Sequence, residues 1–315
     1  MKADDPDSVA HLPGNRPIRP ATHQEFVLFQ TLIHRKAGIY LSPAKKVLLE
    51  GRLAKRLREL GLDSFGAYYR RVVEEGDGEE LIHLLDRIST NETHFFREPR
   101  QFEFLEQHIF PEWSSQASSG IRSRRLWVWS AGCSTGEEPY SAAMTLYEHF
   151  PLSAGWEIEI LATDLSSRAL GWARTAIWPL AKVKEIPPRY VKRFMLRGTR
   201  TQEGKMKVGP EIRSIVRFER LNLNDEVYPV TGLFDLIFCR NVLIYFDAQS
   251  RARAVHRLLN HLAPSGYLFV GHAESLNGVT DQVRSIMPTV YTHAGEQQSG
   301  VKAGAAPLGG VGVTR

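Results

Sequence analysis

The sequence has few cysteines and no long apolar run, and each shortage excludes a class of protein. Two cysteines, Cys133 and Cys239, cannot build a disulfide framework, and their spacing is not that of a zinc site. We expect both to be small, buried core residues, with no metal bound. No stretch approaches the roughly 18 uninterrupted apolar residues of a membrane span, and no apolar signal core follows the N-terminus. These absences predict a cytoplasmic protein without direct membrane insertion.

The pattern of apolar residues divides the chain into a helical part and an α/β part. The 315 residues are 43% hydrophobic, which is enough for a real core. Residues 1–22, rich in proline, and 295–315, without periodicity, are expected to be a disordered arm and tail. Residues 23–90 carry apolar residues at three- and four-residue spacing, which predicts a small all-helical domain. Residues 91–100 form a linker, and in residues 101–294 strands alternate with helices.

Four apolar runs bounded by Gly, Asp or Pro read as buried strands, at 126–129, 158–162, 233–239 and 267–270. Helical stretches at 140–149, 167–175 and 248–262 separate them. This alternation predicts a parallel, doubly wound, Rossmann-like sheet. A basic, glycine-containing stretch between 179 and 222 interrupts the rhythm and reads as a hairpin-bearing insertion.

A glycine loop follows the first of these strands. Gly132 and Gly136 permit a tight turn, and a helix then opens on Glu137 and Glu138. Since two acids would repel a pyrophosphate, the loop favours a cationic, hydroxyl-bearing ligand such as S-adenosylmethionine. Asp164 ends the next strand, where a carboxylate can accept two ribose hydroxyls; the alternative is a helix N-cap.

The same loop also fits G-x-S-x-G, the nucleophile elbow of α/β hydrolases, with Ser134 as nucleophile. Asp235 and His272 would then complete a triad. However, the loop follows the first strand of the α/β part, and no oxyanion segment precedes it. These features favour the cofactor-binding interpretation.

Three further segments carry candidate chemistry. Arg240 and Asn241 end a buried strand, where α/β sheets bind ligands; a strand-end salt bridge is the alternative. The interdomain segment 90–99 is polar, then doubly aromatic, then basic, so it can close over a ligand with Arg97 facing an anionic group, or pin the domains together. Residues 34–71 hold ten Lys or Arg against three acids. Helical spacing places four of them on one face, opposite a leucine face: Lys45, Arg52, Lys55 and Arg56.

The motifs together resemble the CheR family of bacterial chemotaxis methyltransferases. The resemblance rests on the segments Thr90–Glu98, Trp129–Ser141, Ala162–Asp164 and Phe238–Phe246, which occur in the family's order within residues 23–293. It implies S-adenosylmethionine-dependent methylation of glutamate side chains on chemoreceptors, with S-adenosylhomocysteine as product and no metal or nucleic acid. By motif position the cofactor contacts would be Asn91, Thr93, Arg97, Glu137, Asp164, Asn222, Leu223, Arg240 and Asn241.

The resemblance also implies roles outside the cofactor contacts. Tyr245 would lie near the transferred methyl, and Arg97 would align an anionic group. The basic helix face would dock the acidic methylation helices of the receptor. A small β-subdomain near 190–215 binds a receptor's C-terminal pentapeptide in some members, but here Arg200 stands where a glycine is usual, although Gly198 and Gly204 are present. Methylation of RNA or a small molecule, or a non-catalytic cofactor sensor, are the alternatives.

Overall fold

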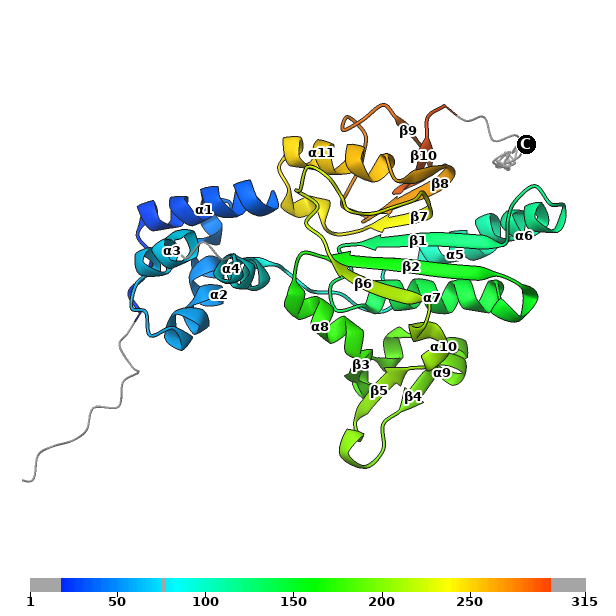
Figure 1. Cartoon of the computed structure of the whole chain (residues 1–315), viewed down its shortest axis with the longest axis horizontal. Helices are drawn as coiled ribbons and strands as arrows, with labels where there is room; N and C mark the ends of the chain where they lie inside the picture. The colour runs from blue at the N-terminus through cyan, green and yellow to red at the C-terminus, as the bar shows by residue number, and fades with distance from the viewer. Residues whose placement is uncertain (1–17, 75–77, 296–315) are drawn as a thin grey trace, which may run out of the picture.

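The computed structural model describes residues 18–74 and 78–295, so the expected arm and tail lie almost wholly outside the described residues. A helical domain comes first, and an α/β domain follows it (Figure 1). The helical domain consists of α1 (His23–Ala37), the one-turn η1 (Pro43–Lys45), α2 (Lys46–Glu59), α3 (Phe65–Glu74) and α4 (Glu79–Ile88). Thr22 and Glu25 form a reciprocal capping box that fixes the start of α1. The predicted helical domain is therefore present, with the expected leucines Leu49, Leu53 and Leu57 in its core.

A seven-stranded sheet forms the centre of the α/β domain, in the order β6-β2-β1-β7-β8-β10-β9. Its strands are β1 (Arg125–Ala131), β2 (Glu157–Asp164), β6 (Val216–Arg220), β7 (Phe234–Cys239), β8 (Leu262–Val270), β9 (Val283–Met287) and β10 (Val290–His293). Its helices are α5 (Pro99–Phe104), the π-helical turn η2 (Leu105–Ile109), α6 (Phe110–Ser118), α7 (Glu137–His149), α8 (Ser167–Thr175) and α11 (Ala248–Leu259).

Both faces of this sheet are buried, because alternate residues of each central strand enter different cores. In β7, Leu236 and Phe238 belong to a core with residues of α5, α6 and α7. Ile237 and Cys239 point to the opposite face, into a core with residues of α11. Helices on both faces of a largely parallel sheet confirm the doubly wound fold.

The sheet differs from the sequence expectation at both edges. β10 pairs antiparallel with β8 and β9, so the sheet is mixed and the expectation of an entirely parallel sheet is wrong there. β6 pairs parallel with β2, although the sequence analysis placed its residues in the insertion. The sequence pattern did not predict these edge strands, because β6 and β9 are only half-buried and lack the continuous apolar runs of β1, β7 and β8.

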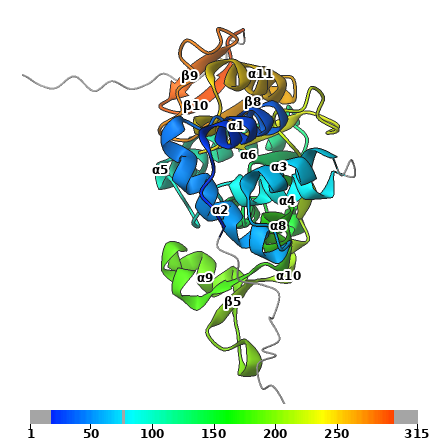
Figure 2. The same ribbon diagram turned by 90° about the vertical axis from the view of Figure 1, so that its left-hand side faces the viewer.

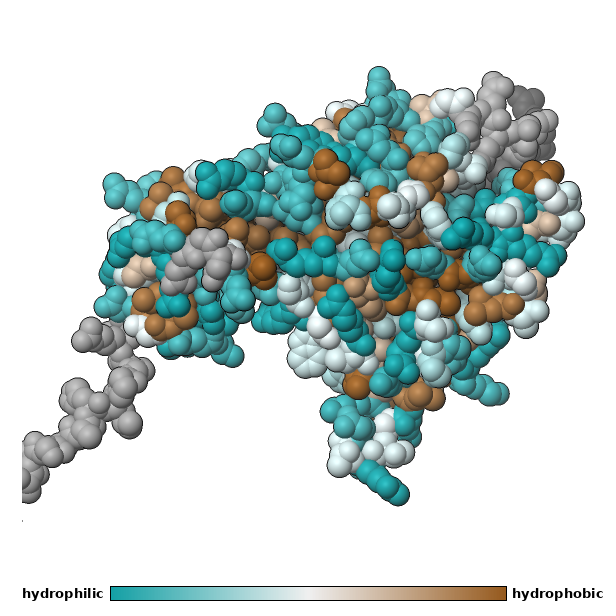
Figure 3. Space-filling model, in the orientation of Figure 1, coloured by the Kyte–Doolittle hydropathy of each residue, from teal (hydrophilic) through white to brown (hydrophobic). Residues whose placement is uncertain are grey.

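The insertion forms a three-stranded antiparallel sheet, β3-β5-β4, that projects below the main sheet in Figure 1. It contains β3 (Ile177–Pro179), η4 (Leu180–Glu185), α9 (Pro188–Phe194), β4 (Met195–Arg197), η5 (Arg200–Gln202), β5 (Lys205–Val208) and α10 (Pro210–Arg213). It thus starts at Ile177, ahead of the expected 190–215 region. Its projecting tip carries hydrophilic or near-neutral residues on the face seen in Figure 3.

The helical domain lies against the carboxyl end of the parallel strands (Figures 1 and 2). Tyr40 N–H donates to the Tyr245 carbonyl at 2.8 Å, and Ile39 bridges to Phe246. The Asn222 amide donates to the Lys36 carbonyl at 2.7 Å. Backbone groups of the helical domain therefore close the end of the sheet where ligands bind in α/β proteins.

The two cysteines can be compared directly with the sequence expectation. Cys133 and Cys239 are free and buried, as expected. Burial raises the pKa of both thiols well above the usual range. Within 18–74 and 78–295, no helix combines the length and apolar character that crossing a membrane requires. In the same ranges, no three His, Cys, Asp or Glu side chains gather in a way that could hold a metal ion.

Candidate cofactor site at the domain junction

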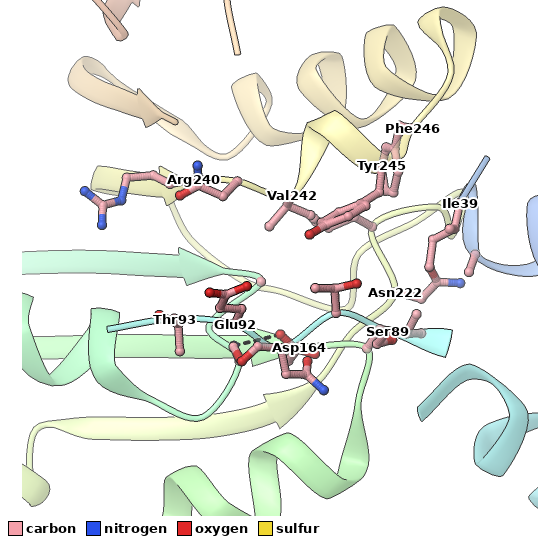
Figure 4. Close-up of a pocket in the computed structure, with 18 of the residues that line it drawn as sticks. Ile39, Ser89, Glu92, Thr93, Asp164, Asn222, Arg240, Val242, Tyr245 and Phe246 are labelled. Atoms are coloured by element: carbon pink, nitrogen blue, oxygen red, sulfur yellow. Dashed lines mark hydrogen bonds between the residues drawn. The ribbon is translucent and has the colours of Figure 1, made fainter. Parts of the chain in front are cut away.

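One cavity lies between the two domains, at the carboxyl ends of β1, β2, β6 and β7. Its wall includes most of the predicted cofactor contacts: Asn91, Thr93, Arg97, Asp164, Asn222, Leu223, Arg240 and Asn241, together with Tyr245. The helical domain supplies Ala37, Ile39 and Ile88. Figure 4 shows Val242 and Tyr245 on one side of the cavity and Ser89, Glu92 and Asp164 on the other. Residues from all four segments that carry the family resemblance thus line one cavity.

The glycine loop approaches the loop after β7 so closely that its first glycine is required. Gly132 has φ +87°, and a Cβ there would lie 2.3 Å from Val242 Cγ2. Gly136 has φ +97°, and a Cβ there would lie 2.9 Å from the Ala173 Cβ. Side chains at these two positions would push the loop away from the cavity wall or from α8.

Asp164 holds the floor of the cavity. One carboxylate oxygen accepts the Ser134 N–H and the other accepts the Ser166 N–H, each at 2.8 Å. Ser166, not Asp164, caps α8, since its hydroxyl accepts the Ala169 N–H. The carboxylate lines the cavity with acceptor capacity left on both oxygens. Burial raises the pKa of Asp164, against the opposing effect of the two backbone donors.

The two acids that open α7 are both paired with cations. Glu137 is 1% exposed, accepts from Lys182 Nζ at 2.5 Å, and is absent from the cavity wall. Glu138 lies at the wall and accepts from Arg240 Nε at 2.7 Å. Adjacent helical residues point about 100° apart, so only one of the two can face the cavity. Both acids are thus paired with cations in the fold, and the role of Glu137 as a cofactor contact stays a prediction.

Arg240 forms a strand-end salt bridge with Glu138, the alternative role that its position in the sequence allowed. Its guanidinium is buried and also donates to the Arg97 carbonyl at 2.7 Å and to Gln101 at 2.8 Å. In Figure 4 it points away from Asp164 and Tyr245. Arg240 thus connects β7 to α7 and to the linker, and it lies at the edge of the cavity wall.

The linker lines the cavity and is anchored to the α/β domain. Asn91, Thr93 and Arg97 lie in the wall, and the Asn91 carbonyl accepts from Ser134 Oγ at 2.9 Å. Phe95 and Phe96 are buried in the α/β core, against Trp178 and against Phe102 and Tyr190 respectively. The two phenylalanines therefore anchor the linker to the α/β domain, and closure of the segment over a ligand stays a prediction.

The four residues of the predicted basic face have different surroundings. Lys55 is exposed, and Lys45 Nζ lies 5.9 Å from the centre of the Tyr245 ring. Arg52 donates to the Ile88 carbonyl and to Thr90 Oγ1. Arg56 is held within the domain by Glu80, with a side-chain contact of 2.6 Å. Arg56 therefore presents a charge that is already paired.

A second hollow adjoins the cavity and shares the wall of residues 89–92 with it. Three arginines from three helices line it: Arg52 of α2, Arg87 of α4 and Arg168 of α8. Arg87 pairs with Glu59 at 2.9 Å. Arg52 and Arg168 have no carboxylate partner in the part of the chain that the structure describes. The hollow thus has three arginines and one carboxylate, Glu92, in its wall, so cations predominate there. Arg87 and Arg168 were not identified from the sequence.

The positions of the proposed triad residues exclude the hydrolase interpretation. Asp235 lies at the start of β7, where it accepts the Trp127 N–H at 2.8 Å and pairs with Arg122. Ser134 follows the opposite, carboxyl end of β1 and donates to a backbone carbonyl. The two residues lie at opposite ends of the sheet and cannot form one triad.

Sequence reasoning missed two groups that support the site, Lys182 and Glu274. Lys182 of η4 joins Glu137 to the linker, donating also to the Thr93 carbonyl at 3.1 Å. Glu274 is 2% exposed and accepts backbone N–H groups of the loop after β7. The only available signal for Glu274 was its place in a Gly-His-Ala-Glu segment directly after a buried strand. Nothing near Lys182 marked it.

Comparison with known proteins agrees with this arrangement. Residues 91–292 match the model described as "CheR methyltransferase, SAM binding domain", and residues 24–89 match "CheR methyltransferase, all-alpha domain". A chemotaxis protein methyltransferase of Borreliella burgdorferi is 37% identical over 271 residues, covering 86% of this chain and 94% of that protein. Chemotaxis protein methyltransferase 2 of Pseudomonas aeruginosa is 38% identical over 274 residues, covering 87% and 94%. The Escherichia coli chemotaxis protein methyltransferase is 37% identical over 261 residues, covering 82% and 87%.

Proposed function

The chain belongs to the CheR methyltransferase family, and from that premise we propose that it methylates glutamate side chains of chemoreceptors to form glutamyl methyl esters. It is an S-adenosylmethionine-dependent methyltransferase of chemotaxis. The proposal concerns the acceptor and the residues that serve it. The observation that carries the proposal is the cationic hollow beside the cofactor cavity, because it suits an acidic partner.

For the cofactor, we assign the ribose hydroxyls to Asp164, whose two oxygens retain acceptor capacity at the cavity floor. Asn91, Thr93, Asn222, Leu223 and Asn241 would complete the cavity around the rest of the molecule. The bound cofactor supplies an electrophilic methyl group on a sulfonium. Apolar side chains such as Ile39, Val242 and Phe246 fit the uncharged parts of such a ligand.

The reaction requires alignment of the acceptor carboxylate with the methyl group more than it requires proton transfer. A glutamate with a pKa of about 4.3 is ionised at neutral pH, so its carboxylate needs no general base. A carboxylate oxygen forms the new C–O bond while the S–C bond breaks and its electron pair stays on sulfur. Alignment of this kind is worth about 7–11 kcal/mol in favourable systems. In this scheme Tyr245 borders the methyl, and Arg97 orients an anionic group.

Acceptor docking is assigned to the rim that both domains share. Arg52 and Arg168 carry charges without carboxylate partners in the described ranges. Lys55 lies on the same helix as Arg52, and Lys45 directly precedes that helix. A helix with several carboxylates would meet cations from both domains on its way to the cavity. Arg56 is left out of this surface because Glu80 already neutralises it.

The β-subdomain is a separate candidate contact for a receptor tail peptide. β4 is an edge strand with Leu196 52% exposed. Arg200 has φ +54°, a backbone conformation that suits the glycine it replaces. Tail-peptide binding would be measured by calorimetry with the pentapeptide, and Arg200→Gly should not weaken it. Absence of binding to the wild-type chain would remove this contact while leaving methylation untouched.

The acceptor assignment is tested with labelled S-adenosylmethionine and receptor cytoplasmic domains, scored as base-labile methyl esters. Arg168→Glu should lower kcat/KM for the receptor at least tenfold, with unchanged affinity for S-adenosylhomocysteine. Arg125→Glu is the matched control, because Arg125 begins β1 at the far end of the sheet and is exposed. Label on RNA or small molecules, and on no receptor, would refute the proposed acceptor. Equal losses in both variants would refute the docking surface.

A further inference from the structure

Glu274 lies where two neighbouring strands end. β7 and β8 are parallel, with Cys239 opposite Val270 as their last paired residues. The segment after β8 therefore runs beside the segment after β7. Glu274 closes the turn that starts at Gly271, its N–H donating to the Gly271 carbonyl at 2.8 Å. This register brings one carboxylate against a loop more than thirty residues earlier in the chain.

The carboxylate collects backbone donors from both segments. One oxygen accepts the N–H groups of Asn241 and Gly271, each at 2.6 Å, and the other accepts the Ile244 N–H at 3.1 Å. A Cβ on Gly271 would lie 2.6 Å from the side-chain nitrogen Nδ2 of Asn241 and 2.7 Å from the Glu274 carboxylate. The glycine is therefore required for this approach. An acceptor-only group with two oxygens suits a cluster of three backbone donors.

The loop held in this way is the part of the cavity wall that carries Asn241, Val242 and Tyr245. Asn241 has φ +59°, an unfavourable conformation for a residue with a side chain, so it needs external support. Glu274 is absent from the cavity wall, and it therefore acts on the cavity only through the loop.

We propose that Glu274 is the positioning residue for the cofactor-binding loop 240–246, fixing Asn241 and Tyr245 against the bound cofactor. A carboxylate is required here rather than an amide. A glutamine has one acceptor oxygen, so its NH₂ group would face either the Asn241 and Gly271 donors or the Ile244 donor. The loop would then shift to relieve the opposed donors. This inference depends on cofactor binding and not on the identity of the methyl acceptor.

Asp235 provides a matched control at the other end of β7. It is also a largely buried carboxylate that accepts a backbone N–H, from Trp127, but it lies away from the cavity. Asp235→Asn removes the same kind of group and charge as Glu274→Gln. A purely structural role for Glu274 would make the two variants alike in stability and in cofactor affinity.

The experiment compares the two variants by calorimetry with S-adenosylhomocysteine, at a temperature where both are folded. We expect Glu274→Gln to raise Kd at least tenfold, and Asp235→Asn to change it less than twofold. The rise in Tm caused by saturating S-adenosylhomocysteine gives a second readout, since it depends on Kd even for a less stable chain. That rise should shrink in Glu274→Gln and persist in Asp235→Asn.

If Glu274→Gln does not fold, Glu274→Asp is measured in the same two ways, because it keeps both acceptor oxygens with a shorter reach. A wild-type Kd in a folded Glu274 variant with reduced Tm would overturn the proposal. Since the assay contains no acceptor, a failure to methylate receptors would leave this result intact and would count only against the proposed acceptor.

Discussion

Replacing Asp164 with alanine should weaken cofactor binding without unfolding the protein. In the structure the carboxylate accepts one backbone N–H on each oxygen, which leaves acceptor capacity for two hydroxyls facing the cavity. Hydrogen bonds to a charged group are worth about 1.5–3 kcal/mol each, and water can replace part of this in the variant. We therefore expect a loss of about 2–3 kcal/mol, or a Kd for S-adenosylhomocysteine raised about 30- to 150-fold.

The control for this prediction is Ser166→Ala. Ser166 neighbours Asp164 in the chain, and its hydroxyl caps α8 by accepting the Ala169 N–H at 3.2 Å. The variant keeps the Ser166 backbone N–H that Asp164 accepts. It should lose about 1 kcal/mol of stability with the cap but bind S-adenosylhomocysteine normally. A folded Asp164→Ala chain with a Kd within twofold of wild type would refute the ribose assignment.

The pH dependence gives an independent check on Asp164. Burial raises the pKa of this carboxyl, and the ionised form is the one that accepts hydroxyls without competition from its own proton. Affinity should therefore fall as pH is lowered through the raised pKa. The ligand-free stability contributed by this group has the opposite sign, because a raised folded pKa stabilises at low pH and that contribution is lost as pH rises. In Asp164→Asn, neither the affinity nor the ligand-free stability should show this pH dependence. A variant that keeps the wild-type pH dependence would contradict the assignment.

Three further predictions concern ion pairs. Arg56→Met leaves the buried Glu80 carboxylate without its cation, so the free energy of unfolding should fall by about 3–5 kcal/mol in a denaturant titration, with cofactor affinity unchanged. Glu25 has a pKa lowered to about 2, chiefly by its ion pair with Arg19; Glu25→Gln should cost about 1–3 kcal/mol at pH 7, and the difference from wild type should vanish as pH falls towards 2. Lys182→Met leaves Glu137 buried and unpaired and frees the linker, so both Tm and affinity for S-adenosylhomocysteine should fall; an unchanged affinity would mean that the linker holds its place without Lys182.

Much of the site could be predicted because the fold brings strand ends together. The loop after β1, Asp164 after β2 and Asn241 after β7 each follow an apolar run, and the carboxyl ends of parallel strands meet at one edge of the sheet. Asp164, Asn241 and Tyr245 therefore fall in one cavity, as the motif positions indicated. The helical domain was also evident, since its leucines repeat at helical spacing.

The pairing of charges was not predictable in the same way. Sequence order made Glu137 and Glu138 look equivalent, yet one meets Lys182 of the inserted subdomain and the other meets Arg240 of β7. By helical spacing Arg56 belongs to an open basic face, but in the fold it pairs with Glu80. Each of these partners is distant in the chain, and no local pattern encodes a contact between elements that pack only after folding.

The sequence by itself determined the family, the alternation of strands and helices, and the chemistry available at each strand end, because these follow from local residue patterns. Only the tertiary structure decided which side chains face the cavity, which charges remain unpaired at its rim, and that Glu274 supports the loop holding Asn241. The physical reason is that burial and ion pairing are properties of the packed chain. A carboxylate accepts whichever donors the fold brings to it, and the donors to Glu274 come from two separate segments of the α/β domain.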